Sequence, residues 1–430
     1  MNSILTCFAL TRFALTRSAF SALPCVQNRF PKPDFESGYA YPGLVYGVPD
    51  EILWTCIDLA ALVLFMSVTA WATLRKRLRT PVLAVAVSSV AYFGFFRKGC
   101  VCSIGAIQNV SLALVDSSYA IPLSVLAVFI LPLVFALLFG RVFCAGTCPF
   151  GALQELINIR NHKVPRPLAS FLSLVPWIYL LLALVFAMTR SSFVICRFDP
   201  FIGIFRMGGE VPMIVAGAVL LIASIFTGRP FCRFLCPYGA LLGLFSRVSV
   251  WNVKIVKQSC INCDLCRNAC YVDAIRPPCD NKVKESRPAG VRRILLYLVV
   301  LPFMAFAGAL AGRALSDSFA GTDKKVRLLE MVLAADAEKN SPESQSFELE
   351  AFHGRGGDVG ELSTQVVAVR NKFKRYSTGA GAMAGIIVGI SLTGLSVKRA
   401  RKHYEINDAH CVSCGRCFAY CPQNLAAKSD

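Results

Sequence analysis

Eight of the cysteines fall into two runs that share one spacing, C-x2-C-x2-C-x3-C. The first run is Cys260, Cys263, Cys266 and Cys270, and the second is Cys411, Cys414, Cys417 and Cys421. Three thiolates separated by two residues can wrap one face of a 4Fe–4S cluster, and the fourth follows after a turn. Structural zinc usually takes two separated C-x2-C knuckles instead. The spacing therefore predicts two 4Fe–4S clusters as cofactors, with these eight cysteines as their ligands.

The fourth cysteine of each run has more than one candidate partner. In proteins with two such clusters it commonly binds the neighbouring cluster, so Cys270 would complete the second site and Cys421 the first. Tyr271 stands where proline usually follows the fourth cysteine, which leaves Cys279 as an alternative fourth ligand for the first run. The two runs are far apart in the chain. We therefore expect a small α+β ferredoxin-like domain that is split between two distant halves.

Four more cysteines lie in an internal repeat. The motif G-R-x-F-C-x3-C-P-x-G-A-L occurs at residues 140–153 and again at residues 228–241. Its cysteines are Cys144, Cys148, Cys232 and Cys236. Repeats of this kind often build one site at their interface, and four thiolates form a complete ligand set for a metal or Fe–S centre. The alternatives are redox-active thiols, or cysteines that only pack at helix ends.

Weaker echoes of the repeat contain three further cysteines, Cys100, Cys102 and Cys196. They predict another metal site, which Asp199, Cys25 or an external ligand would complete. The competing interpretation is a disulfide, for example between Cys102 and Cys196. The repeat and its echoes together predict one or two Fe–S or metal sites in addition to the two clusters.

The segments that must position these cysteines are apolar. Hydrophobic residues make up 55% of the 430 residues, which favours a membrane protein over a soluble domain. Seven segments approach the length of about 20 residues with which a helix crosses a bilayer. They are residues 52–74, 81–96, 119–139, 168–188, 211–227, 294–312 and 379–397. The sequence thus predicts an all-α polytopic membrane protein of about seven transmembrane helices, to which the split ferredoxin-like domain is attached.

The distribution of charge indicates the orientation. The net charge is +19, and Lys and Arg cluster beside the apolar runs, so nucleic-acid binding is not expected. Basic residues concentrate at positions 75–79, 140–167, 228–293 and 398–402. A single orientation places all four regions in the cytoplasm. We therefore expect a multi-pass protein of the inner (cytoplasmic) membrane whose ferredoxin-like domain lies on the cytoplasmic side.

The spans divide the chain into seven expected parts. These are an N-terminal outer segment (1–51), a transmembrane core with the cysteine repeats (52–248), the first ferredoxin half (249–290), a transmembrane helix (291–312), an outer-side segment (313–378), a second such helix (379–397) and the second ferredoxin half (398–430). The outer-side segment mixes an amphipathic stretch, residues 326–335, with a loop rich in Ser, Glu and Gly. It is expected to be a small domain or a docking surface.

The combination of repeated C-x3-C-P motifs with the two ferredoxin runs resembles the NosR/NapH-type polyferredoxin membrane proteins. The similarity covers residues 90–275 and the tail from residue 403. It implies that electrons pass between the quinone pool or a flavoprotein and a redox partner. Some members carry a covalently bound FMN in an outer domain. Residues 313–378 look too short for such a domain, so FMN would lie only on a partner.

Three classes of function compete. The leading interpretation is an electron-transfer subunit, rather than a stand-alone enzyme with catalytic residues, that connects a quinol or an outer-side FMN-binding partner to the cytoplasmic clusters. One alternative is a factor of the CcoG type that reduces a metal such as copper for assembly, and another is a redox sensor. Outward methionine or histidine clusters would favour copper handling, and the sequence shows none. Two complete runs plus four repeated cysteines favour conduction, since a sensor needs one cluster.

Overall fold

The computed structural model describes residues 52–99, 101–159, 162–206, 208, 210–255, 260–279, 287–337, 347–354, 357–395, 401 and 403–424. The chain divides into two units, and the boundary between Ala61 and Leu62 falls inside helix α2 (Ile52–Ala70). The first unit is described only by the first half of that helix. The second unit contains every other element named below.

Helices dominate the described residues. The cysteine-repeat region contains η2 (Trp71–Arg75), α3 (Thr80–Ser89), η3 (Val90–Phe96), α4 (Ser103–Val115), α5 (Leu123–Phe139), η4 (Phe143–Thr147), α6 (Pro149–Ile157), α7 (Arg166–Leu172), α8 (Val175–Met188), α9 (Val194–Arg197), α10 (Ile202–Arg206), α11 (Val211–Phe226), α12 (Pro230–Phe234) and α13 (Pro237–Ser246), where η marks π-helical turns. The rest contains α14 (Leu265–Ala269), β1 (Ile275–Arg276), α15 (Arg287–Ala320), α16 (Lys324–Ala337), α17 (Phe347–Gly354), α18 (Val359–Leu395), β2 (Glu405–Ile406) and α19 (Arg416–Ala419). The predicted helical class is thus confirmed, with one small sheet.

Four of the described helices are long and apolar enough to cross a membrane. They are Ile52–Arg75, Pro167–Met188, Gly290–Ala320 and Val359–Gly394. The other three expected spans coincide with shorter apolar helices, Thr80–Phe96, Leu123–Phe139 and Val211–Phe226, and Ser103–Val115 is a further short one. A helix rises about 1.5 Å per residue, so these shorter helices do not reach the roughly 30 Å of a hydrocarbon core.

The polar segment expected between the last two spans largely continues their helices. α15 extends to Ala320, and α18 begins at Val359 instead of near residue 379. The predicted amphipathic stretch lies in α16, whose Val326 packs against Leu362 and Val366 of α18. This buried contact stabilises the polar beginning of α18, which hydropathy alone does not mark. Much of the Ser- and Glu-rich loop, residues 338–346, lies outside the described residues.

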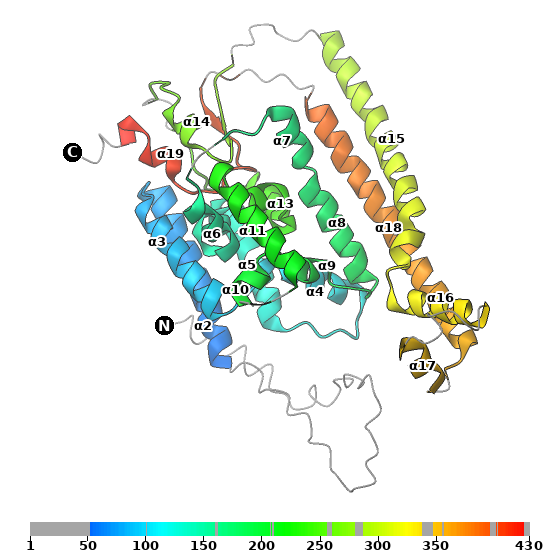
Figure 1. Ribbon diagram of the computed structural model, residues 1–430. Helices are drawn as coiled ribbons and strands as arrows, with labels where there is room; N and C mark the ends of the chain where they lie inside the picture. Colours follow the sequence, from blue (N-terminus) through cyan, green and yellow to red (C-terminus); the bar gives the residue numbers. More distant parts are fainter. Residues whose placement is uncertain are drawn as a thin grey trace. The chain divides into compact units, whose positions relative to one another are not determined.

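Helices α15 and α18 lie side by side over most of their length (Figure 1). Glycines allow this approach: a Cβ on Gly308 or on Gly381 would collide with the other residue's backbone. Small residues at such crossings are typical of helix pairs in membranes. The pair also contacts α8, where Phe373 of α18 meets Phe186 edge-on.

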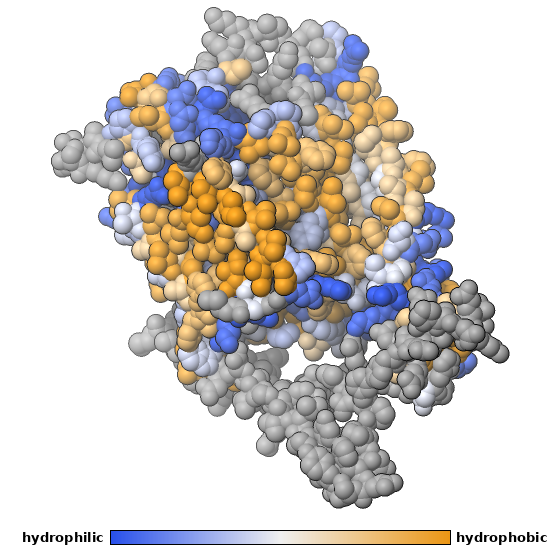
Figure 2. Space-filling model, in the orientation of Figure 1, coloured by the Kyte–Doolittle hydropathy of each residue, from blue (hydrophilic) through white to orange (hydrophobic). Residues whose placement is uncertain are grey.

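Hydrophobic side chains gather over the middle of the face shown in Figure 2, and hydrophilic side chains lie toward both of its ends. On α11 the exposed residues include Val215, Val219 and Ile222, and on α15 they include Leu298 and Val299. Water disfavours apolar surface of this extent, whereas lipid tails cover it at no cost. The apolar band is that of a membrane protein.

A two-stranded antiparallel sheet joins the chain segments of the two cysteine runs. Ile275 of β1 pairs with Ile406 of β2, and Arg276 pairs with Glu405. Beyond the sheet, helices α14 and α19 contact one another. The two runs, distant in sequence, thus lie within one small α+β layer formed by residues 260–279 and 403–424. We name it the ferredoxin-like layer.

Candidate iron–sulfur sites

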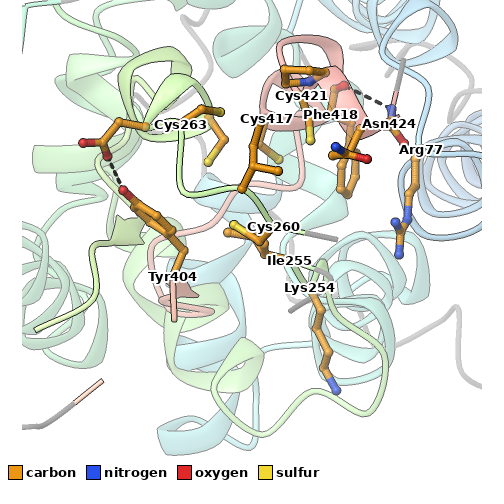
Figure 3. A pocket seen from close by; sticks show the side chains of 15 residues that line it. Arg77, Lys254, Ile255, Cys260, Cys263, Tyr404, Cys417, Phe418, Cys421 and Asn424 are labelled. Atoms are coloured by element: carbon orange, nitrogen blue, oxygen red, sulfur yellow. Dashed lines mark hydrogen bonds between the residues drawn. The ribbon is translucent and has the colours of Figure 1, made fainter. Parts of the chain in front are cut away.

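The first pocket collects cysteines from both runs. Its volume is about 170 Å³, and its lining includes Cys260, Cys263, Cys266, Cys417 and Cys421 (Figure 3). The Cys266 thiol interacts electrostatically with Cys260, Cys263 and Cys421. Three cysteines of the first run therefore face the last cysteine of the second run.

A second, smaller pocket shows the reciprocal arrangement. It is lined by Cys411, Cys414 and Cys417 of the second run together with Cys270 of the first. The Cys417 thiol interacts electrostatically with all three of the others. Gly415 adopts a left-handed conformation in this loop, with a φ of 73°, which lets the chain turn tightly between the thiols. The structure therefore gathers the eight cysteines around two pockets, each lined by cysteines of both runs, and Cys417 lines both pockets.

Cys279 lies in neither pocket. Its backbone N–H and C=O pair with the C=O and N–H of Arg401 at 2.9 and 3.0 Å. Its side chain lines a separate cavity beside Pro277 and His410. The geometry thus favours Cys421 over Cys279 as the fourth residue of the first set.

The chemistry of these pockets fits iron. Burial raises the pKa of the Cys411 thiol to about 12 and that of Cys414 to about 11. Iron–sulfur clusters are held by cysteine thiolates. The positive charge of bound iron would therefore have to offset the cost of ionising these buried thiols. No three of the described His, Cys, Asp or Glu side chains approach closely enough to hold a single metal ion. A 4Fe–4S cluster is larger, and its ligands stand farther apart.

The four cysteines of the internal repeat also converge. The Cys148 thiol interacts electrostatically with Cys144, Cys232 and Cys236. Cys148 directly precedes α6, Cys236 directly precedes α13, and a proline opens each helix. The N–H of Gly239 donates to Cys236 Sγ at 3.3 Å, Gln154 Nε2 donates to Cys232 Sγ at 3.6 Å, and an Arg141 N–H points at Cys144 Sγ at 3.8 Å. Helix N-termini and donors aimed at sulfur favour thiolates.

The arginine of each repeat reaches into the other repeat. Arg229 donates to the carbonyl oxygens of Cys144 and Ala145, the latter at 2.7 Å. Because Gly151 has no side chain, the Arg229 guanidinium can approach to 3.2 Å from where a Cβ would stand, and Arg141 lies at the same distance from the Cβ position of Gly239. Each copy of the motif thus contacts the other copy through its arginine. We name these contacts of Arg141 and Arg229 the clasp.

A buried carboxylate joins this clasp to the ferredoxin-like layer. Glu155 of α6 pairs with Arg229 and accepts a hydrogen bond from the Tyr271 hydroxyl at 3.0 Å. Its other oxygen lies 3.6 Å from both Arg79 and Arg416. The side chains of Glu155 and Arg229 are only 2% and 1% exposed. We name Glu155, Arg229, Tyr271 and Arg416 the junction.

The junction lies within electrostatic reach of two sets of thiols. The Arg229 guanidinium interacts electrostatically with Cys232 of the repeat and with Cys414 of the second run. The Tyr271 ring packs so closely on Gly228 that a Cβ there would collide with it. The Arg229 charge therefore favours the thiolate form of both Cys232 and Cys414, whereas the nearby Glu155 carboxylate disfavours it at Cys414.

The echo cysteines form a sparser group. The thiols of Cys102 and Cys196 interact electrostatically with one another and with Asp199. Gln108 Oε1 accepts hydrogen bonds from the N–H groups of Ile195 and Cys196, which ties this loop to α4. Cys102 and Cys196 are both free, so the structure does not form the alternative disulfide. Cys100 and Cys25 lie outside the described residues.

Comparison with known proteins places the repeat in a recognised family. The 4Fe-4S binding domain family matches residues 121–167 and 211–255, and each match contains one copy of the repeat. Regulatory protein NosR of Stutzerimonas stutzeri is 31% identical over 244 residues, 53% of this chain and 33% of NosR. The predicted NosR/NapH-type resemblance is confirmed. The chain thus resembles iron–sulfur membrane proteins of the NosR/NapH type.

Two further relatives of the NosR/NapH type agree. The putative electron transport protein YccM of Escherichia coli is 32% identical over 188 residues, 39% of this chain and 52% of YccM. Protein NirI of Paracoccus denitrificans is 31% identical over 154 residues, 33% of this chain and 23% of NirI. The chain thus spans about a third of NosR and about half of YccM. No solved structure shows significant similarity to it.

Sequence reasoning missed the junction. Glu155 lies inside α6 without any motif of its own, and nothing in its local sequence marks it as buried. Two signals were present. Arg141 and Arg229 occupy the same position in both copies of the repeat, and Tyr271 breaks the usual C-P ending.

Proposed function

We propose that this protein relays electrons between a quinol, or an outer-side flavoprotein partner, and 4Fe–4S clusters at the cytoplasmic face of the inner membrane. The observation that carries the proposal is the adjacency of repeat thiols and ferredoxin thiols, with Arg229 within electrostatic reach of both. A protein that only stored or sensed electrons would not need a second set of thiols beside the first.

We assign the ligands of three centres. Cys260, Cys263, Cys266 and Cys421 would hold one cluster, Cys411, Cys414, Cys417 and Cys270 the second, and Cys144, Cys148, Cys232 and Cys236 a third centre in the membrane core. The family match over both repeat copies supports the third centre. When bound, such clusters supply one-electron oxidation and reduction. Cys102 and Cys196, with Asp199 or Cys100, are the candidates for an outer metal site.

The chain's own residues would insulate and align these centres. Phe150 packs against Phe201 and Phe231 beside the repeat, which keeps water away from its thiols. The clasp and the junction would fix the distance between the centres. All seven apolar segments would span the membrane, the three short helices by local thinning of the bilayer or within the bundle. FMN would remain on the partner.

The experiment is a metal count on anaerobically purified protein in mild detergent. Three clusters predict about twelve irons with matching sulfide per chain, and two predict about eight. Cys144→Ser should remove about four irons and one set of EPR signals after dithionite reduction, while Cys279→Ser should remove none. Stoichiometric zinc with little iron would overturn the assignment.

A regulatory role is the second candidate, because NosR carries the name of a regulatory protein. Adding a quinone analogue such as menadione, or free FMN, to the reduced protein distinguishes electron relay from regulation. Reduced protein that either acceptor reoxidises rapidly supports the relay. Reduced protein that neither acceptor reoxidises favours regulation.

A further inference from the structure

A large cavity opens between the membrane helices and the ferredoxin-like layer. Its volume is about 840 Å³. Helices α8 and α18 line it together with the end of α13, and residues of the ferredoxin-like layer close it. Its existence follows from the packing of α18 on α8. The two helices meet firmly around Phe186 and Phe373, and the cavity lies farther along α18, at residues 383–394.

One wall of the cavity is apolar. It consists of Leu174, which directly precedes α8, of Trp177 from α8, and of Met383, Ile386, Ile387 and Ile390 from α18. Met383 and Ile390 are more than half exposed. These residues belong to helices that are apolar enough to span a membrane. Water against such a wall is unfavourable, so hydrocarbon is the natural filling.

The other wall is cationic. Arg247, Arg276 and Arg401 line it with His410 and Asn407, and no Asp or Glu is among the described residues of the lining. The Nε of Arg401 is buried and has no hydrogen-bond partner among the described residues. A buried donor of this kind calls for an acceptor. The neighbouring cavity shares Arg276 and Arg401 and adds Lys163, Arg233 and Arg267, and Asp273 is the one acid among the described residues of its lining.

We propose that this cavity binds one anionic glycerophospholipid. Its acyl chains would lie along α8 and α18, and its phosphate would accept hydrogen bonds from Arg276 and Arg401. Basic pockets between membrane helices are suited to such headgroups. An isoprenoid quinone would match the apolar wall, but its neutral headgroup would bring no negative charge to a wall lined by three guanidinium groups. The bound lipid would fill the space between α8 and α18 and would contact Arg276 of β1.

This inference rests on the membrane placement within the proposed function but not on electron relay. Iron content therefore serves as an independent readout. A variant that keeps its iron and loses its lipid tests the cavity alone, whereas wild-type protein without iron would count against the cluster assignment and leave the lipid result standing.

The test compares lipid retention by native mass spectrometry. Wild-type protein is reconstituted in nanodiscs of equal phosphatidylglycerol and phosphatidylcholine, transferred to detergent and analysed. We expect one phosphatidylglycerol per chain. The double variant Arg276→Gln/Arg401→Gln should bind it about thirtyfold more weakly, since each cation near the headgroup contributes severalfold. Arg370→Gln, on the same α18 but in an exposed pair with Glu330, is the matched control and should retain the lipid.

A second variant keeps the proposal testable if the double variant does not fold. Ile387→Trp leaves every charge in place and fills the apolar end, so it should also lower phosphatidylglycerol retention. Equal retention of both lipids by the wild type would overturn the proposal. So would a bound isoprenoid quinone in place of the phospholipid, or unchanged retention in both variants.

Discussion

Glu155 offers the sharpest test of the junction. Glu155→Gln keeps the shape of the side chain but removes the charge that balances Arg229. The Arg229 side chain is 1% exposed, and its guanidinium also donates to the carbonyl oxygens of Cys144 and Ala145. Breaking a buried pair in this way costs about 3–5 kcal/mol because a charge stays buried without compensation. Arg416, at 3.6 Å and 12% exposed, adds less because water reaches it.

The loss should appear as local opening of the ferredoxin-like layer. A cost of about 3–5 kcal/mol raises the population of the open state by roughly two to four orders of magnitude. Hydrogen exchange under anaerobic conditions would measure it in peptides from residues 404–424. Glu330→Gln is the matched control, because Glu330 pairs with Arg370 at 3.5 Å and both are about half exposed. Such a pair is worth about 1 kcal/mol or less.

A double-variant cycle identifies the partner. If Arg229 is the charge that Glu155 balances, Glu155→Gln/Arg229→Gln should exchange less than the sum of the single variants predicts. Equal exchange in Glu155→Gln and Glu330→Gln would refute the reasoning. The Arg229 charge would then be balanced by the thiolates around it and not by the carboxylate.

Three further variants test other contacts, each with its own measurement. Cys421→Ser should lower the iron content by about one cluster, whereas Cys279→Ser should leave iron and EPR signals unchanged. Gly381→Ala should lower the thermal midpoint in detergent, since its Cβ would meet backbone across the helix pair and overpacking costs about 1–3 kcal/mol. Gly379→Ala, where a Cβ meets nothing within 4 Å, should not lower it. Gly228→Ala should increase exchange in residues 404–424, because its methyl group would displace the ring packed upon it.

Local sequence determined much of the site. Spacing alone predicted which cysteines gather, because a C-x2-C-x2-C turn places its thiols on one side whatever lies around it. The exchange of Cys270 and Cys421 required only that the two runs meet, and the pairing of Ile275 with Ile406 brings them together. The repeated motif at residues 140–153 and 228–241 is visible in the sequence, and the convergence of its four cysteines follows from the pairing of the two copies.

Properties that depend on distant contacts could not be predicted in this way. The early start of α18 depends on the packing of Leu362 and Val366 against Val326, which no local pattern shows. The cavity beside Trp177 depends on where α18 meets α8. Hydropathy locates apolar segments, but it does not say how far their helices extend or where two helices part.

Tyr271 shows how a departure from a motif can be misread. In the sequence, Tyr271 in place of the usual proline leaves Cys279 as an alternative fourth ligand for the first run. In the structure, Tyr271 contacts Gly228, donates to Glu155, and lies under the guanidinium groups of Arg416 and Arg229, at 4.6 and 5.7 Å from its ring centre. A proline offers neither a hydroxyl donor nor an aromatic face. The substitution is therefore explained by the attachment of the ferredoxin-like layer to the membrane core, and it requires no change in the cysteine ligands.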